Sequence, residues 1–244
     1  MTSPSGLATH LRCEYLVNPM TVDAAAPRLS WEMVSDAPGA AQSAYRVIAA
    51  DSREALRRHE GNLWDSGQVA SNQSMQVHYA GKNLTSCKQV FWKVMIWDEQ
   101  GRAGRWSKAA TFTMGLLDRN DWKGQFIGNY LSNSPACPLL RKEFETRGPV
   151  KRALLYATAK GVAHLTVNGR DVSDDLFAPG WTEYKKRFNY RCYDVTAMLR
   201  KPGTQCMGGE VANGWFKGRI ARQHMGDGYG HRTGLLAQLR IEYA

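Results

Sequence analysis

The sequence predicts an all-β protein built from two β-sandwich domains, and three observations point to this fold class. Short runs of alternating apolar and polar residues recur along the chain, with Gly, Pro, Asn or Asp between them. Asn168-Gly169 lies between two strand-like runs, which is a strong short-range signal for a hairpin. There is no long helical period and no internal repeat, so a parallel sheet with connecting helices is disfavoured.

The first domain is expected over residues 11–117, after a disordered start at residues 1–10 that is rich in Ser, Thr and Gly. One short helix is expected within it, with Asp51 as the N-cap, Glu54 completing a capping box and Arg58 near the end. The other elements are strand-like runs at 28–33, 44–49, 64–69, 74–79, 91–98 and 110–113. About seven short strands in about 105 residues are typical of an immunoglobulin-like sandwich.

The run at 91–98 predicts which side chains form the first core. Successive residues of a strand point to opposite faces. Trp92, Val94 and Ile96 therefore share one face, and we assign this face to the core because it is uniformly apolar. The opposite face includes Lys93, which favours a position outside the core.

The second domain is expected over residues 139–244, after a linker at residues 118–138 whose second half is rich in Asn, Ser and Pro. An aromatic run lies near its centre. Phe188 and Tyr190 are two positions apart, so they are predicted to share one face of a strand.

Six short motifs follow one another in the second domain and are specific only as a series. They are Leu140-Arg141-Lys142-Glu143-Phe144, Lys151-Arg152-Ala153 with Leu155-Tyr156-Ala157, Val167-Asn168-Gly169, Pro179-Gly180-Trp181-Thr182 with Tyr184, Tyr193-Asp194-Val195-Thr196 and Asn213-Gly214-Trp215-Phe216-Lys217-Gly218. This series resembles the N-terminal accessory domain of bacterial α-L-rhamnosidases, a jelly-roll domain of the carbohydrate-binding type. In the first domain, Pro27-Arg28-Leu29-Ser30-Trp31, Trp64-Asp65-Ser66-Gly67 and Trp106-Ser107 resemble a fibronectin type III domain and, more specifically, the first domain of the same enzymes.

The resemblance implies a non-catalytic region of a glycoside hydrolase. Inverting hydrolysis needs two carboxyl groups across the scissile bond, and in this family they lie on a helical barrel that the sequence does not supply. We therefore expect no catalytic residue and no cofactor here. The implied role is to brace the catalytic barrel and edge its cleft, with a rhamnoside-containing carbohydrate as the ligand of the parent enzyme. The chain stops at Ala244, before the family's closing strands, so an incomplete second domain with an exposed, self-associating edge is expected.

Five residues in or beside Gly-rich loops are candidates for carbohydrate contact: Trp181, Tyr184, Asn213, Trp215 and Tyr229. Exposed aromatic rings can stack on sugar rings. The alternative is that the aromatic members fill the core or an interface between domains, where Trp and Tyr contribute most.

The sequence predicts no metal site. Asp174-Asp175 are adjacent carboxylates in a loop and are expected to be solvated. Some α-L-rhamnosidases carry a calcium-dependent rhamnose-binding module with an Asp-Asn pair, but the equivalent place here reads Thr158-Ala159-Lys160-Gly161. The five cysteines are odd in number and include no Cys-x-x-Cys pair, which favours reduced thiols in a cytoplasmic protein.

Two other functions stay open at this point. A free-standing carbohydrate-binding module could use the Trp181 and Trp215 loops. A nucleic-acid-binding protein could use the net charge of +10, but the basic residues are scattered and no recognition motif accompanies them, so no nucleic-acid partner is expected.

No run of about 18 apolar residues occurs, so no membrane partner is expected. Met1 to His10 lacks the pattern of a secretory signal, which favours the cytoplasm, and a periplasmic or secreted protein stays open if the N-terminus is truncated.

Overall fold

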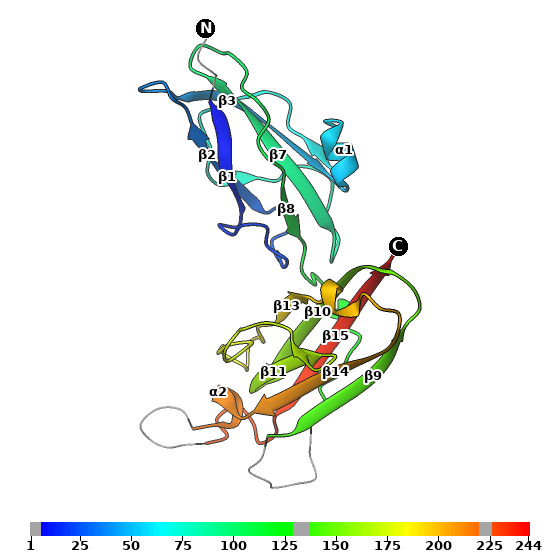
Figure 1. Cartoon of the computed structure of the whole chain (residues 1–244). Helices are drawn as coiled ribbons and strands as arrows, with labels where there is room; N and C mark the ends of the chain where they lie inside the picture. Colours follow the sequence, from blue (N-terminus) through cyan, green and yellow to red (C-terminus); the bar gives the residue numbers. More distant parts are fainter. Residues whose placement is uncertain (1–5, 129–136, 220–225) are drawn as a thin grey trace. The chain divides into compact units, whose positions relative to one another are not determined.

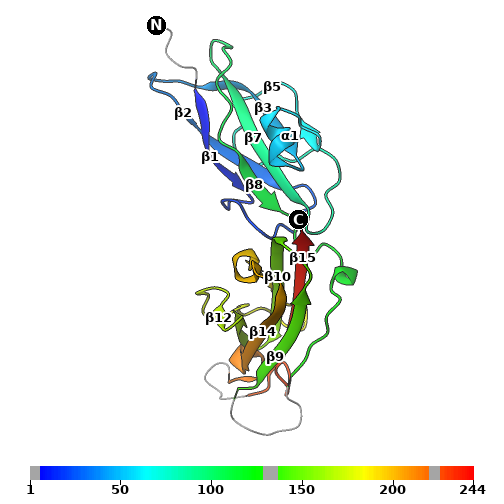
Figure 2. The ribbon, with the colours of Figure 1, turned by 45° about the vertical axis from the view of Figure 1, so that its right-hand side comes forward.

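The computed structural model describes residues 6–128, 137–219 and 226–244, and the chain divides into two compact units, Met1–Asp121 and Trp122–Ala244. Each unit is built from antiparallel sheets that enclose a core of its own (Figure 1 and Figure 2). The predicted all-β class with two sandwich domains is therefore confirmed.

The first unit packs a three-stranded sheet against a five-stranded one. The smaller sheet has the spatial order β1 (Leu7–Cys13), β2 (Arg28–Val34) and β6 (Val77–His78). The larger sheet has the order β4 (Trp64–Asp65), β3 (Gln42–Ala50), β7 (Gln89–Asp98) and β8 (Ala110–Thr113), and β5 (Val69–Ala70) also pairs with β3. The helix α1 (Arg53–Arg57) lies against β3 and β7, and η1 (Arg119–Asp121) is the last element of this unit.

The core of the first unit lies between these two sheets. Trp92, Val94 and Ile96 of β7 are fully buried there, so the predicted face is confirmed. Lys93 is also buried, contrary to expectation, because the outer face of β7 is covered as well. Its Nζ lies 5.1 Å from the centre of the Trp106 ring, and the aliphatic stem of a lysine packs well in such a place while its charge faces the ring.

Two predictions for the first unit are wrong in detail. β1 begins at Leu7 and pairs with β2, so residues 7–10 are ordered; residues 1–5 lie outside the described residues. The N-cap of α1 is Ser52, whose hydroxyl accepts a hydrogen bond from the Ala55 N–H at 3.2 Å. Asp51 instead accepts a hydrogen bond from the Asn62 side-chain amide at 2.8 Å, which occupies the carboxylate that was predicted to cap the helix.

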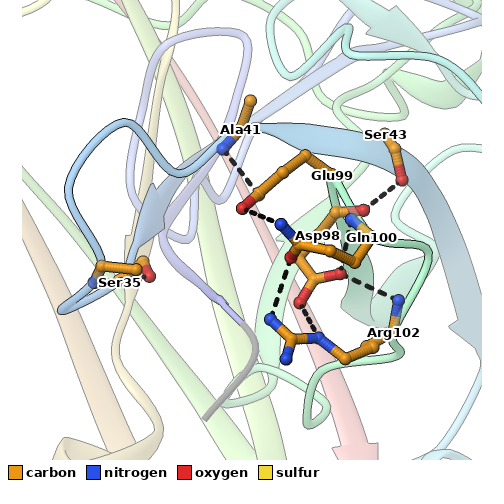
Figure 3. A network of polar contacts seen from close by, with 8 residues as sticks. Ser35, Ala41, Ser43, Asp98, Glu99, Gln100 and Arg102 are labelled. Atoms are coloured by element: carbon orange, nitrogen blue, oxygen red, sulfur yellow. Dashed lines mark hydrogen bonds and ion pairs between the residues drawn. The ribbon is translucent and has the colours of Figure 1, made fainter. Parts of the chain in front are cut away.

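The turn after β7 is organised by one buried carboxylate, Asp98 (Figure 3). Its Oδ1 accepts hydrogen bonds from the backbone N–H groups of Gln100 and Arg102 at 3.1 and 2.8 Å, and its Oδ2 accepts one from the Arg102 Nε at 2.8 Å. Burial by itself would raise the pKa of Asp98, but these hydrogen bonds outweigh it and hold the pKa below its ordinary value.

Asp98→Asn is expected to lower the melting temperature at neutral pH and to flatten its decline in acid. A carboxylate with a depressed pKa stabilises the fold above its unfolded pKa, and this contribution is lost as the pH falls through the folded pKa. Melting curves followed by circular dichroism from about pH 7 to about pH 2 would measure the difference. The matched control is Asp174→Asn in an exposed loop. Parallel pH curves for the wild type and Asp98→Asn would contradict this role.

The second unit also has two antiparallel sheets. One has the order β13 (Arg191–Asp194), β10 (Val150–Lys160) and β15 (Gly234–Tyr243). The other has the order β12 (Arg170–Asp171), β11 (Val162–Val167), β14 (Gly203–Ala212) and β9 (Leu139–Thr146). The short helical turns η2 (Thr196–Leu199) and α2 (Gly214–Lys217) follow β13 and β14.

The hairpin between β11 and β12 confirms the prediction made from Asn168-Gly169. Both residues have positive φ, 52° and 72°, which Asn and Gly adopt more readily than other residues. The Asn168 side chain adds a further restraint, since its Oδ1 accepts a hydrogen bond from the Cys206 N–H of β14 at 2.9 Å. The turn is therefore fixed both by local geometry and by the neighbouring strand.

Close packing explains a glycine pair in β14. A Cβ added at Gly209 would lie 2.5 Å from a Leu235 methyl group of β15 in the opposite sheet. A side chain at this position would therefore push the sheets apart. Gly209 therefore serves packing between the sheets, whereas a Cβ at Gly208 would lie 2.6 Å from the Thr166 hydroxyl of β11 in the same sheet. Both roles agree with the absence of a phosphate-loop pattern in this part of the sequence.

One further expectation changes in the second unit. Phe188 and Tyr190 lie in the irregular segment before β13, so they do not share the face of a strand. The segment after Asp121 packs onto a domain, as expected from its apolar residues Trp122, Phe126 and Ile127. The Trp122 ring contacts that of Tyr190, with centroids 5.5 Å apart, and Ile127 forms a β-bridge with Leu235. This part of the predicted linker belongs to the second sandwich, and residues 129–136 lie outside the described residues.

β15 is an edge strand of its sheet, and it contributes Leu235 to the core of the second unit. It pairs with β10 from Val150↔Tyr243 to Lys160↔Gly234, and its other side meets Ile127 at Leu235. An edge of this kind can template pairing with another chain. Self-association through it stays a prediction.

Candidate functional site

Three loops carry the predicted contact residues, and an aromatic cluster fixes them to one another in the second unit. Tyr184 comes from the loop between β12 and β13, Phe216 from α2, and Tyr229 from the loop before β15. The Tyr184 ring centroid lies 5.3 Å from that of Phe216 and 5.0 Å from that of Tyr229. Phe188 joins the same cluster, 5.4 Å from Tyr184. Edge-on and tilted contacts of this kind add to the energy of burying the rings.

Tyr184 forms the centre of this cluster. Its side chain is 6% exposed, and its hydroxyl donates a hydrogen bond to the Gly180 carbonyl at 3.3 Å. Burial, with a smaller effect of the neighbouring Tyr229, raises the pKa of Tyr184. The ring faces are covered by other rings, so Tyr184 is a core residue and not an accessible platform for a sugar. This corrects its place among the candidates, because the covering rings come from distant parts of the chain.

Trp181 and Trp215 are more exposed than Tyr184. Trp181 is 56% exposed, and Trp215 is half-buried with its ring edge-on to that of Phe177, at 6.0 Å between centroids. Phe177 and Leu176 are themselves 66% and 83% exposed. We use the name apolar rim for Leu176, Phe177, Trp181 and Trp215, of which Phe177 and Trp215 are in ring contact. Such exposed apolar side chains, when grouped, mark contact surfaces.

Leu176 and Phe177 were missed by the sequence analysis. They are two large apolar residues between Asp175 and Ala178, in a segment with no strand-like alternation. A pair of apolar residues in a loop usually suggests that the loop packs inward. The structure shows the opposite, with Ala178 and Pro179 buried and Leu176 and Phe177 outside.

The other two candidates, Tyr229 and Asn213, form hydrogen bonds with nearby residues of the second unit. Tyr229 is half-buried, and its hydroxyl donates a hydrogen bond to the Glu183 carboxylate at 3.4 Å. Asn213 is exposed and precedes α2 without a capping hydrogen bond from its side chain. Its carbonyl accepts a hydrogen bond from the Lys217 N–H at 3.2 Å, so its backbone closes the helical turn. The structure thus brings Trp215 beside the exposed loop residues and makes Tyr229 a support.

The carboxylates near the rim serve as acceptors within the loops. Asp174 and Asp175 are exposed, as predicted. Asp175 accepts a hydrogen bond from the Tyr193 hydroxyl at 3.2 Å, and burial together with this carboxylate raises the pKa of Tyr193. This contact ties the long loop to β13.

Within residues 6–128, 137–219 and 226–244, no three or more His, Cys, Asp and Glu side chains are grouped as metal ligands. None of the helices in these ranges has the length and apolar character needed to cross a membrane. All five cysteines are free thiols, and burial raises the pKa of Cys13 to about 12, which makes this thiol unreactive.

Comparison with known families divides the chain at the same place as the structure. Residues 8–118 match the family described as "Rha78A-like, N-terminal immunoglobulin domain". Residues 148–244 match the family described as "Alpha-L-rhamnosidase N-terminal domain". The two matches follow each other in the order of the two units.

Similar proteins carry these two domains within much longer chains. An α-L-rhamnosidase of Formosa agariphila is 39% identical over 226 residues, which cover 87% of this chain and 24% of that protein. The solved α-L-rhamnosidase from Dictyoglumus thermophilum has a TM-score of 0.88 and 30% identity, over 100% of this chain and 28% of that one. A Streptomyces avermitilis α-L-rhamnosidase solved with L-rhamnose has a TM-score of 0.91 and 25% identity, and the match covers 98% of this chain and 40% of that one. The chain spans about a quarter of the length of the curated relatives it matches.

Proposed function

Because the chain consists of the N-terminal domain pair of α-L-rhamnosidases, we propose that it braces the catalytic part of such an enzyme and edges its cleft. One observation carries this proposal. Two non-catalytic domain families account for both units, in order, and together they correspond to about a quarter of the relatives' length. The substrate of the parent enzyme is then a rhamnoside-containing carbohydrate, in keeping with the names of these relatives.

The apolar rim is the surface that best suits this role. Its members include one half-buried Trp and three exposed side chains, and buried aromatic anchors dominate the binding energy of protein interfaces. The aromatic cluster beneath holds the loops, so little ordering entropy is lost when a partner covers the rim. The occupant we propose is the catalytic part of the same enzyme.

The chain alone is expected to release no nitrophenol from 4-nitrophenyl α-L-rhamnoside. The reason is that inverting hydrolysis needs an acid and a base placed across the bond, and the family resemblance places this pair on a helical barrel outside the two domains. An intact α-L-rhamnosidase is the positive control. Turnover that stays with this chain through repurification would contradict a purely accessory role.

A chimera tests the bracing role directly. In it, this chain replaces the matching region of the Formosa agariphila relative. Phe177→Ser combined with Trp215→Ser is expected to lower the melting temperature of the catalytic part, because it removes the apolar anchors of the contact. Val17→Ser, which changes an exposed apolar residue of the first unit, is the matched control. If both variants melt like the parent chimera, the rim does not contact the barrel.

A second function, carbohydrate contact through the rim, is favoured by the exposed ring of Trp181. The same chimera can distinguish carbohydrate contact from the bracing role. Trp181→Ala is expected to raise KM for the rhamnoside and leave the melting temperature unchanged if this ring touches the sugar. A change in melting temperature without a change in KM supports the brace alone.

A further inference from the structure

We infer that a hollow in the first unit binds a neutral sugar ring, independently of the proposed brace. The hollow has a volume of about 330 Å³, which is within the range of small-ligand sites. Residues of β3, β4, β5 and β6 line it together with the loop between β5 and β6. The ones that matter here are Tyr45, Trp64, Gln73, Gln76 and His78.

The charge of the lining points to an uncharged ligand. The chain has 32 Lys and Arg and 22 Asp and Glu, yet the lining contains none of these four residue types. A site for a phosphate or a carboxylate would be expected to offer Arg or Lys, and a site for a cation would offer carboxylates. Amides, aromatic rings and one imidazole instead suit a ligand that is polar and neutral.

Two aromatic rings in the lining are held in fixed positions. The Tyr45 ring packs edge-on against Trp31, at 5.2 Å between centroids. The Trp64 ring packs edge-on against Tyr79, at 5.3 Å. Trp64 stays half-buried, so part of its surface faces the hollow. A rigid aromatic surface of this kind can cover the apolar face of a sugar ring at little entropic cost.

Polar atoms of the lining lack partners that a polyhydroxylated ligand could supply. Tyr45 is only 7% exposed, and its hydroxyl has no hydrogen-bond partner among the residues that the structure describes. The Gln73 side-chain amide donates hydrogen bonds to the carbonyls of Met75 and Gln76 in the same loop. The Gln76 side-chain amide donates one to the Tyr15 hydroxyl. Gln73 and Gln76 are exposed, and their amide oxygens accept no bond in the same described ranges. The Tyr45 hydroxyl is not among the fully buried atoms without a partner, so it is open to solvent. A ligand hydroxyl can therefore replace water at these three groups.

The loop that carries both glutamines is anchored to the core. The Gln42 side-chain amide donates hydrogen bonds to the carbonyls of Ser71 and Gln73 at 3.1 and 3.0 Å. The Trp31 indole N–H in turn donates to the Gln42 Oε1 at 2.8 Å. The backbone of the loop beside the hollow is thus anchored to the buried Trp31 through Gln42.

Nuclear magnetic resonance of the whole chain can test the site. The chain has eight Trp residues, so eight indole N–H signals are expected. Titration with L-rhamnose, D-glucose and D-galactose should shift the Trp64 indole signal and the Gln73 and Gln76 side-chain amide signals saturably for at least one sugar. The Trp122 indole signal in the second unit should not move with them.

Variants complete the test. Tyr45→Phe removes only the hydroxyl and should weaken binding about two- to tenfold, the effect of one net hydrogen bond, with an unchanged fold. Trp122→Phe, an aromatic control in the second unit, should bind like the wild type. The site is overturned if no sugar gives a saturable shift, or if shifts are confined to Trp181 and Trp215. Equal affinity of Tyr45→Phe and the wild type would also overturn it.

Discussion

Trp92→Ala is expected to lower the free energy of unfolding of the first unit by about 3–5 kcal/mol, the range for truncating a large buried aromatic side chain. Trp92 is fully buried in β7, between the two sheets of this unit. Removing the indole loses its transfer energy and leaves a cavity that two packed sheets cannot easily fill. Denaturant unfolding followed by circular dichroism would measure the loss.

Two controls separate burial from aromatic character. Trp97 lies on the other face of the same strand and is half-buried, so Trp97→Ala should cost clearly less. Trp92→Phe should cost less than Trp92→Ala because the phenyl ring leaves a smaller cavity. Both variants remove the buried indole N–H, which has no hydrogen-bond partner in the described ranges. Equal losses for Trp92→Ala and Trp97→Ala would show that the assignment of the core face is wrong.

The parts of the fold that could be predicted are those set by local sequence. The alternation in β7 identifies Trp92, Val94 and Ile96 as core residues because the side-chain period of a strand is two. Asn168-Gly169 identifies the hairpin because few other residues adopt positive φ so readily. Both features can be predicted from neighbouring residues alone, although the Cys206 N–H also holds the Asn168 side chain.

Other features could not be predicted because they depend on contacts between distant residues. Asp51 and Ser52 are both good N-caps, and the choice of Ser52 follows from the hydrogen bond that Asp51 makes with Asn62. Phe188 has the spacing of a strand residue, but its ring is held by Phe126 and Phe216, far away in the sequence. The spacing of residues in the sequence cannot reveal the hydrogen bond of Asp51 with Asn62 or the rings that hold Phe188.

The candidate site was predicted in the same uneven way. The sequence pointed to Trp181 and Trp215 because both lie in or beside Gly-rich loops, and the structure leaves Trp181 exposed and Trp215 half-buried. Nothing in the sequence pointed to Phe177. The hollow of the first unit could not be predicted from the sequence. Its lining residues Tyr45, Trp64 and Gln73 come from separate segments that come together only when the sheet forms.

Tyr184→Ala is expected to lower the free energy of unfolding of the second unit by about 3–5 kcal/mol, again the range for a large buried aromatic. Tyr184 contacts Phe188, Phe216 and Tyr229, which come from the same loop, α2 and the loop before β15. Its removal therefore leaves a cavity at the point where the three loops meet. We expect faster hydrogen exchange around α2 as well as a lower midpoint in denaturant.

Trp181→Ala is the matched control for this change, because it removes a larger ring from the same loop. Trp181 is largely exposed, so its loss should cost less than about 0.5 kcal/mol. Tyr184→Phe keeps the ring and removes the hydrogen bond to Gly180, so it should cost about 1 kcal/mol. If Tyr184→Ala were as mild as Trp181→Ala, Tyr184 would be an accessible side chain after all, and it would return to the residues that can contact a sugar.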